Sequence, residues 1–259
     1  MNERLGFDRV PEIYDRVRPT YPDALFDELF AHLSTEQPSV VEIGAGTGKA
    51  TGSLLQRGAR VTAVEIGANL ARFLRDKFAG DERLDVINDP FEDAELAPAA
   101  FDLVFAATAF HWVDPAVRYV KSHDLLRLGG VLAVVSTNQI RSDADHGYFA
   151  RVQPLYRRYY PDEEAPDVPG EDVVPAELGE MQSGGLFEDV TLHRYRWDQT
   201  YTSAQYGDLV RSYANTQAME RSKAESLIAE LCRVIDDEFG GSMVRPLVMT
   251  LTMGRKPAG

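Results

Sequence analysis

The stretch from Val40 to Lys49 constrains the fold of this chain more than any other part of the sequence. It is an apolar run that contains one acid, Glu42, and ends in three glycines on alternate positions, Gly44, Gly46 and Gly48. An apolar run that is bounded by glycines is typical of a buried parallel strand. Glycines at these positions let the backbone turn tightly and approach a ligand that a Cβ atom would keep away. Because a short helix is expected from Thr51 to Leu55, the pattern predicts a strand–loop–helix unit whose helix N-terminus faces a nucleotide-type ligand.

Strand and helix patterns alternate regularly after this loop. The expected strands and helices follow one another at residues 60–65, 69–78, 84–88, 101–106, 115–128 and 131–136. Such alternation predicts an α/β protein with a doubly wound, Rossmann-like, mostly parallel sheet and helices on both faces. Right-handed crossovers then place a ligand at the carboxyl edge of the strands, near the point where the strand order reverses.

The regular alternation stops after Ser136. We interpret residues 1–259 as a single domain with a cofactor-binding core at 1–137, and with helical insertions at 138–185 and 203–240. We expect these insertions to form a cap over the ligand edge, where a cap excludes water and shapes a substrate pocket. The alternative is that these helices only complete the hydrophobic core. The remaining strands are expected at Val190–Trp197 and Met243–Met253.

Composition and charge exclude several classes of function. A net charge of −14 argues against a nucleic-acid partner, because phosphate contacts need clustered Lys and Arg. No apolar stretch reaches the roughly 18 residues that span a bilayer, and the first residues lack the apolar region of a signal peptide, so we expect no membrane partner and a cytoplasmic location. Cys232 is the only cysteine, which excludes a cysteine-based zinc site, and the histidines show no ligand spacing, so no metal site is expected.

Two cofactor classes fit a glycine loop of this kind. A dinucleotide site uses G-x-G-x-x-G, but here the position of the third glycine holds Lys49. Glu42, directly before the loop, would repel a pyrophosphate. The same carboxylate suits a cofactor that carries an ammonium and a sulfonium group. The spacing and the acid therefore favour S-adenosylmethionine over a nicotinamide or flavin dinucleotide.

Further candidate residues follow the next strands. Glu65 lies on the order of 20 residues past the first glycine, where an acid in such folds binds the ribose hydroxyls. After the third strand, Phe91 could pack on an adenine ring, and Asp89 or Glu92 could accept from its amine. The alternative for these acids is capping of a helix start. Small residues after the fourth strand, Ala107 and Thr108, let backbone carbonyls reach a ligand ammonium.

The motifs together resemble a known family. The pattern Glu42-x-Gly44-x-Gly46-x-Gly48, with Glu65, Phe101–Val104 and Ala109–Asp114, is similar to class I S-adenosylmethionine-dependent methyltransferases, in particular the small-molecule enzymes of the trans-aconitate methyltransferase and "methyltransferase type 11" kind. The opening Tyr14–Pro22 is also similar to that group, and the resemblance covers about residues 10 to 137.

The resemblance implies a seven-stranded sheet whose last strand is antiparallel, with glycine-loop contacts to the methionine part, Glu65 on the ribose and Arg18 near the methionine carboxylate. The chain departs from many relatives by carrying Pro90-Phe91 where they carry Asp-Ala for adenine. The full set of expected cofactor-binding residues is Arg18, Glu42, Gly44, Ala45, Gly46, Gly48, Glu65, Ile66, Asp89, Phe91, Glu92, Ala107 and Thr108.

Methyl transfer is an in-line displacement at a carbon that the sulfonium already activates, so the protein mainly aligns the reactants and excludes water. His111 is the candidate general base for a hydroxyl acceptor, and the alternative is that it only forms part of the pocket wall. The expected acceptor-binding residues are Tyr14, Tyr21, Trp112, Tyr148 and Arg151.

The favoured function is therefore methyl transfer to a small molecule, by O-methylation of a carboxylate or a hydroxyl, in a monomer or homodimer. Two alternatives stay open at this point. One is an NAD(P)-dependent oxidoreductase, and the other is a non-catalytic protein that binds S-adenosylmethionine.

Overall fold

The structure of the chain, a computed structural model, describes residue 8 and residues 11–161 and 168–259. The chain forms two compact units, each built from three separate stretches. Unit 1 comprises Met1–Pro19, Asn138–Val173 and Arg196–Val248, and unit 2 comprises Thr20–Thr137, Val174–Tyr195 and Met249–Gly259.

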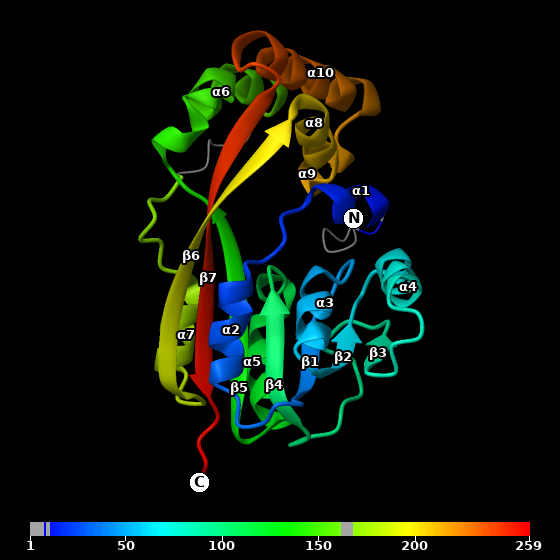
Figure 1. The fold of residues 1–259 in the computed structure, drawn as a ribbon, viewed down its shortest axis with the longest axis vertical. Helices are drawn as coiled ribbons and strands as arrows, with labels where there is room; N and C mark the ends of the chain where they lie inside the picture. The colour runs from blue at the N-terminus through cyan, green and yellow to red at the C-terminus, as the bar shows by residue number, and fades with distance from the viewer. Residues whose placement is uncertain (1–7, 9–10, 162–167) are drawn as a thin grey trace. The chain divides into compact units, whose positions relative to one another are not determined.

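Seven strands form one sheet in the order β3-β2-β1-β4-β5-β7-β6 (Figure 1). The first five strands in the chain pair in parallel, and the last two run antiparallel. The strands are β1 (Ser39–Ile43), β2 (Arg60–Val64), β3 (Leu84–Ile87), β4 (Phe101–Ala107), β5 (Leu126–Gln139), β6 (Glu188–Thr202) and β7 (Ser242–Arg255). The predicted doubly wound α/β fold and its antiparallel end are therefore confirmed.

The helices of unit 2 precede β1, connect the parallel strands or follow β5. They are α2 (Asp23–Ala31), α3 (Lys49–Gln56), α4 (Ala68–Lys77), the 3-10 turn η2 (Phe110–Trp112), α5 (Pro115–Leu125) and α7 (Ala176–Ser183). Unit 1 contains α1 (Pro11–Val17), η3 (Asp143–Asp145), α6 (Tyr148–Tyr159), α8 (Ser203–Arg211), α9 (Ala214–Ala218) and α10 (Arg221–Glu238). Among the described residues, no helix combines the length and the apolar character that crossing a membrane requires.

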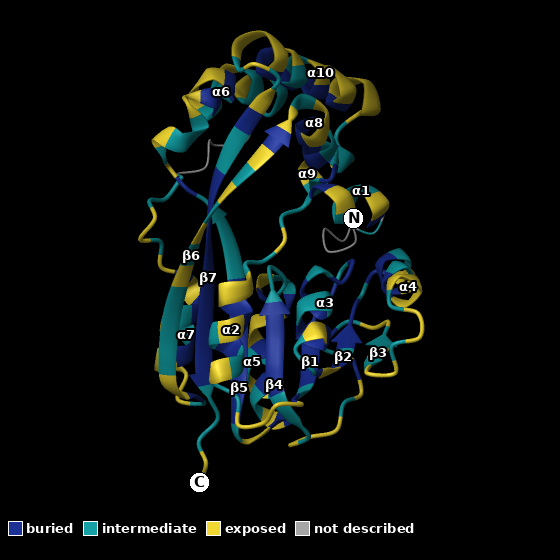
Figure 2. Cartoon of the chain, in the orientation of Figure 1, coloured by how far each residue is buried: buried dark blue, intermediate teal, exposed yellow. Residues whose placement is uncertain are grey.

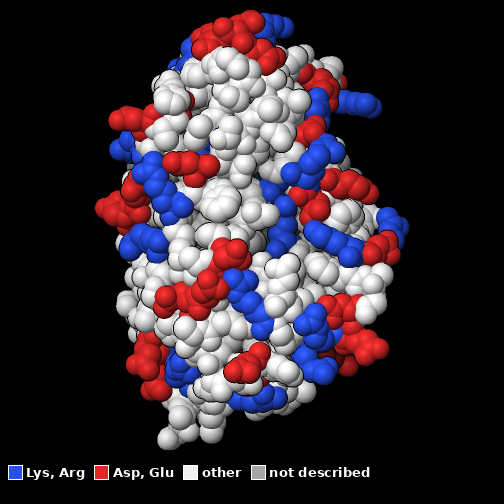
Figure 3. Space-filling model, viewed as in Figure 1, with Lys and Arg blue, Asp and Glu red and all other residues white. Residues whose placement is uncertain are grey.

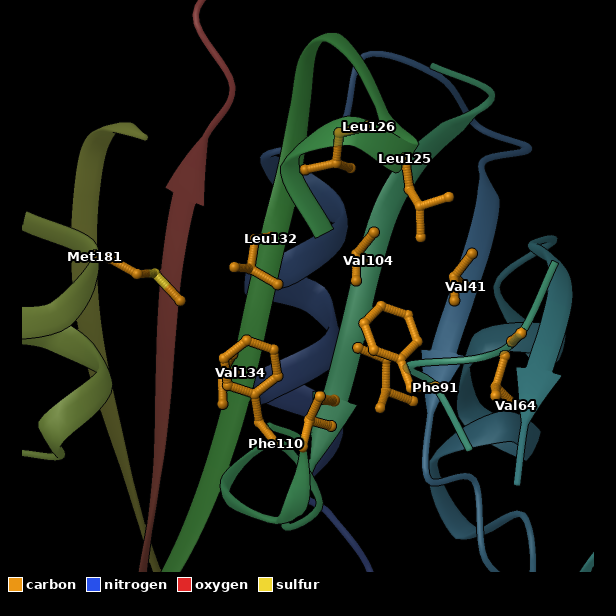
Figure 4. Close-up of a cluster of buried hydrophobic side chains, with 14 of the residues drawn as sticks. Val41, Val64, Phe91, Val104, Phe110, Leu125, Leu126, Leu132, Val134 and Met181 are labelled. Atoms are coloured by element: carbon orange, nitrogen blue, oxygen red, sulfur yellow. The ribbon is translucent and has the colours of Figure 1, made fainter. Parts of the chain in front are cut away.

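Alternation along β4 explains why helices cover both faces of the sheet in unit 2. Val104 and Phe105 are both fully buried, and consecutive side chains in a strand point to opposite faces. Phe105 meets Phe26 of α2 at 6.1 Å between ring centroids. Val104 belongs to a cluster on the other face, with Val41 and Phe110 (Figure 4). Burial on both faces accounts for the continuous apolar runs of the parallel strands, most of which Figure 2 shows as buried.

The core of unit 1 is a separate helical cluster. Buried apolar residues of α8 and α10, including Leu209, Leu227 and Leu231, pack together with Tyr148 of α6. The apolar positions of α10 recur at helical spacing, so this helix presents one face to the cluster. Unit 1 therefore has its own hydrophobic core.

Two expected boundaries differ in the structure. The helix expected at 115–128 ends at Leu125, because Leu126 turns into β5 and is buried opposite Phe101. The insertion expected at 138–185 is divided between the units. Its last part, α7, belongs to unit 2, where Met181 is buried in the same cluster as Val104.

Candidate active site

The glycine loop follows β1 at the carboxyl edge of the parallel strands in unit 2. Gly44, Gly46 and Gly48 all have positive φ angles, at 65°, 59° and 80°, where a residue with a Cβ is strained. An added Cβ would lie 2.5 Å from the Ala109 Cβ at Gly44, and 2.5 Å from Leu74 and Phe78 atoms at Gly48. At Gly46 it would meet nothing within 4 Å. A side chain at Gly44 would thus collide with the Cβ of Ala109, and one at Gly48 with the ends of two side chains, whereas Gly46 keeps an open space over the loop.

Glu65 follows β2 and ties the loop to the next turn. One carboxylate oxygen accepts a hydrogen bond from the Gly46 N–H and the other from the Gly67 N–H, both at 2.8 Å. The side chain is buried. Two bonds from backbone N–H groups fix the carboxylate beside the open position at Gly46, and a carboxylate offers about four acceptor positions in all. This geometry suits a ligand with adjacent hydroxyl groups.

Glu42 is a second buried carboxyl group at the same edge. The Thr51 hydroxyl donates a hydrogen bond to it at 2.6 Å. Burial raises the pKa of Glu42 to about 8, the Thr51 bond opposes this shift, and the charge of Glu65 adds to it. A cationic ligand beside these two carboxyl groups would favour ionisation of Glu42, whereas a pyrophosphate would oppose it.

The backbone is strained at Thr108, the residue that directly follows β4. Its φ angle is 54°, which is uncommon for a β-branched residue, and such strain concentrates at functional sites. The Thr108 hydroxyl donates to the Ala107 carbonyl at 2.8 Å and lies 3.5 Å from the Tyr21 hydroxyl. The structure therefore brings together two residues that the sequence expected on the cofactor and acceptor sides of the site, Thr108 and Tyr21.

His111 lies in η2, two residues beyond Ala109. Its ring is exposed and contacts the half-buried Trp112 at 4.9 Å between centroids. Partial desolvation lowers the pKa of His111 below its usual value, the charge of Glu177 opposes this shift, and Arg118 adds to it. A neutral imidazole at neutral pH can accept a proton. Glu177 of α7, which is buried, was not identified from the sequence.

The turn after β3 differs in part from expectation. Phe91 is 4% exposed, packs in the cluster around Val104, and lies under the Lys121 ammonium at 5.1 Å. A ring that is covered in this way fits a core residue, so the structure does not favour the expected stacking of Phe91 on adenine. Asp89 is exposed, and one Glu92 oxygen accepts from the Asp114 N–H at 2.9 Å.

Asn88 was not identified as a site residue, although it connects two strand ends. Its side-chain amide donates to the carbonyls of Glu65 at 2.8 Å and Ile66 at 3.1 Å. Asn88 thus holds the turn after β2, which carries the Glu65 carboxylate. The one sequence signal for this role is that Asn88 directly follows a strand at the carboxyl edge of the sheet.

Four expected site residues belong to unit 1. The Arg18 guanidinium lies over the rings of Tyr14 and Tyr213 and donates to the hydroxyl and carbonyl of Ser212. Tyr148 is fully buried among aromatic rings of the unit 1 core, and Arg151 forms an exposed ion pair with Glu238. The last two placements are those of a core residue and a surface ion pair, so they do not favour the expected contacts to an acceptor.

Arg245 in β7 is a charged residue of unit 1 that sequence patterns did not identify. Its guanidinium donates to the Tyr213 hydroxyl at 2.8 Å and to the Gln139 side chain at 3.2 Å. Burial acts to lower the pKa of Arg245, and neighbouring tyrosines, among them Tyr213, act to raise it. Among the described residues no carboxylate forms an ion pair with it. A shielded cation among neutral partners is suited to an anionic ligand.

Sequence comparison finds methyltransferases. A family model described as a methyltransferase domain matches residues 41–134. An uncharacterized methyltransferase of Mycobacterium tuberculosis is 35% identical over 131 residues, which are 51% of this chain and 51% of that protein. The match thus spans about half the length of the curated relatives.

Structural comparison gives the same fold. A structure from Anaeromyxobacter dehalogenans, provisionally described as a type II methyltransferase, has a TM-score of 0.68 at 22% identity and covers 93% of this chain and 98% of its own. A phosphoethanolamine N-methyltransferase 2 of Haemonchus contortus, in complex with phosphomonomethylethanolamine and S-adenosylhomocysteine, has a TM-score of 0.57 at 14% identity and covers 99% of this chain and 60% of its own. At these identities the likeness shows the fold alone.

Proposed function

Because the chain belongs to the class I S-adenosylmethionine-dependent methyltransferases, we propose that it transfers a methyl group to a small-molecule acceptor and binds the cofactor at the glycine loop of unit 2. The observation that carries this proposal is the arrangement of Gly46 and Glu65. The loop is open at Gly46, and the Glu65 carboxylate is fixed beside it by two backbone N–H groups. The family membership removes the reason to retain the oxidoreductase alternative.

The residues at the loop fit the chemical groups of this cofactor. Glu65 would accept hydrogen bonds from the ribose hydroxyls, and the open space at Gly46 would admit the cofactor to the backbone. Glu42, which accepts from the Thr51 hydroxyl, would interact with the positive charge of the amino acid part, and this charge would favour the ionised form of Glu42. Asp89, which is exposed, is the proposed acceptor for the adenine amine.

When bound, the cofactor would supply an activated methyl group on a sulfonium for transfer to an acceptor oxygen. The residues of the chain then position the acceptor and exclude water. For a hydroxyl acceptor, we propose that a neutral nitrogen of His111 takes the proton. Its lowered pKa keeps the imidazole unprotonated at neutral pH. A carboxylate acceptor needs no base.

The acceptor that we favour is a small molecule with a carboxylate. The guanidinium of Arg245 supports this choice, because its described partners are neutral and it therefore keeps its positive charge available for an anion. Arg18, which stacks on Tyr14 and Tyr213, adds a second guanidinium to the same unit. These two guanidinium groups fit best an acceptor that carries a carboxylate, which would be O-methylated on the carboxylate itself or on a hydroxyl of the acid.

A nucleic-acid partner is disfavoured by charge. The net charge is −14, and on the face in Figure 3 Lys and Arg are interspersed with Asp and Glu. Neutralising phosphates requires basic groups that are clustered on one face. We therefore propose that the acceptor is a small molecule. We also propose that the protein is cytoplasmic and that it is a monomer or a homodimer.

Calorimetric titration with S-adenosylhomocysteine, and with NADH in parallel, tests the cofactor. Binding of the first compound alone is expected. The Glu65→Gln variant should bind it more weakly by about 1.5–3 kcal/mol, because a charged acceptor is lost. Glu36→Gln, a change at an exposed acid, is the matched control and should bind like the wild type. Unchanged affinity in a folded Glu65→Gln variant would remove Glu65 from the site, and binding of NADH alone would overturn the proposal.

Turnover is tested separately by incubating the protein with S-adenosylmethionine and a panel of small carboxylic acids and phenols. Formation of S-adenosylhomocysteine with one class of acceptor is expected. Cofactor binding without turnover on any of them would favour the alternative of a non-catalytic binding protein.

A further inference from the structure

A cluster of metal-ligating side chains lies in unit 2, outside the site described above. It consists of Glu28 and His32 at the C-terminal end of α2 and His193 in β6, and we call it the Glu28–His193 cluster. Its members offer one ligand atom each, and these atoms lie within 4.8 Å of one another. The sequence predicted no metal site, because His193 is far from the other two residues along the chain.

The distances within the cluster are close to those of a metal site. The Glu28 Oε1 atom lies 3.7 Å from His32 Nδ1 and 3.7 Å from His193 Nε2. Tetrahedral zinc with bonds of about 2.0–2.2 Å places neighbouring ligand atoms about 3.4 Å apart. The two histidine ligand atoms also lie within 4.8 Å of each other. Rotation of these partly exposed side chains would bring the three atoms to ligand spacing.

A second observation points to a ligand. The Nε2 atom of His193 is buried and has no hydrogen-bond partner among the described residues. Buried polar atoms in native proteins are nearly always satisfied, by protein, water or an ion. This nitrogen faces the Glu28 carboxylate, so an ion placed between them would satisfy both groups.

His32 is already held in place for this role. Its Nδ1 atom lies 2.9 Å from the backbone carbonyl of Glu28 and forms a hydrogen bond there when it carries the proton. Ligation through Nδ1 exchanges this bond for a metal bond and moves the proton to Nε2. The backbone of His32 is fixed as well, because its carbonyl accepts from Arg255 of β7 at 2.9 Å.

We propose that the Glu28–His193 cluster binds a divalent transition-metal ion of the zinc type, and that the ion links α2 to β6. Two imidazoles and one carboxylate are a donor set for zinc and its neighbours, whereas Mg²⁺ and Ca²⁺ prefer oxygen ligands only. Three protein ligands leave a position for water, which the partly exposed Glu28 side chain allows. Because the ion binds the folded arrangement, it stabilises unit 2.

The test uses the full chain without a histidine tag, freed of metal with a chelator. Zn²⁺ is titrated in competition with a chromogenic chelator, and thermal unfolding is followed with and without Zn²⁺. One equivalent is expected to bind and to raise the melting temperature, and an excess of Mg²⁺ should leave binding unchanged. His193→Ala and Glu28→Gln should each weaken binding by at least about tenfold and abolish the rise in melting temperature.

His146→Asn is the matched control. His146 belongs to unit 1 and has a φ angle of 51°, which asparagine tolerates, so this variant should bind Zn²⁺ like the wild type. Circular dichroism checks that each variant is folded, and Glu28→Gln preserves side-chain size if His193→Ala does not fold. Absence of stoichiometric binding, or equal affinity in the two cluster variants and the wild type, would overturn the proposal.

Discussion

Replacing Glu42 by glutamine is expected to change how the stability of the protein depends on pH. In the folded chain Glu42 is buried beside Thr51, and burial together with the charge of Glu65 raises its pKa from 4.5 to about 8. In the unfolded chain the same carboxyl group is in water and titrates near 4.5. Between these two values the folded state retains a proton that the unfolded state has released.

The sign of the effect follows from this difference in bound protons. Stability falls as pH rises wherever the folded state binds more protons than the unfolded state. With pKa values of 4.5 and about 8, the contribution of Glu42 is fully present below 4.5 and is lost as pH rises through 8. Between about pH 5.5 and about pH 8 the loss amounts to roughly 3 kcal/mol. The glutamine variant lacks this loss, so its free energy of unfolding relative to the wild type should increase by that amount.

Urea unfolding across this pH range measures the difference. The sequence has two tryptophans, Trp112 in unit 2 and Trp197 in unit 1. A Trp197→Phe background leaves Trp112 as the only indole, so that its fluorescence reports on the unit that contains Glu42. Glu36→Gln in the same background changes an exposed acid and corrects for the other titrating groups.

A stability difference between Glu42→Gln and the wild type that is constant across this pH range would refute the reasoning. It would mean that Glu42 is ionised in the folded chain and that Thr51 or another donor outweighs its burial. A difference that also appears in Glu36→Gln would place the effect elsewhere in the chain.

Three further predictions concern the proposed site. Gly46→Ala should lower the free energy of unfolding by about 1–2 kcal/mol, because alanine is strained at a positive φ angle, and should weaken S-adenosylhomocysteine binding by at least tenfold. Thermal unfolding measures the first effect and calorimetry the second, and an unchanged affinity would contradict the role of the open space. His111→Gln should lower kcat for a hydroxyl acceptor by a factor of about 10²–10⁴ at unchanged cofactor affinity. The wild type should lose activity as pH falls through the pKa of His111, which lies below 6.5, and a rate that does not depend on pH would contradict a general base. Arg245→Gln should raise KM for a carboxylate acceptor by tenfold or more with the cofactor affinity unchanged, in initial-rate measurements.

The parallel part of the fold could be predicted because its signals are local. Apolar runs at 40–43 and 101–106, each followed by glycine or small residues, indicate buried strands without reference to the rest of the chain. The end of α5 could not be predicted in the same way. Leu126 and Leu128 continue an apolar pattern, and only the pairing of Leu126 with Phe101 shows that the chain has already entered β5.

The site shows the same division between local and long-range signals. Glu65 and Gly46 could be matched because a βα unit has a nearly constant length, and the structure joins them by a hydrogen bond. The burial of Phe91 could not be predicted, because an aromatic residue after a strand has the same sequence signal whether it packs in the core or against a ligand. The contacts of Arg245 with Gln139 depend on two strands that are more than a hundred residues apart.

The strand order has a consequence for synthesis of the chain. β7 is made after β6 but lies between β5 and β6 in the sheet, and the N–H groups of Gly129 and Ile140 in and after β5 bond to carbonyls of Lys256 and Pro246. While the chain emerges from the ribosome, β6 therefore has no neighbour to pair with until β7 has followed it out. Its unpaired edge is exposed during that interval, as is the edge of β5. During synthesis the sheet should thus form in full only in a late step, in which β7 inserts between β5 and β6.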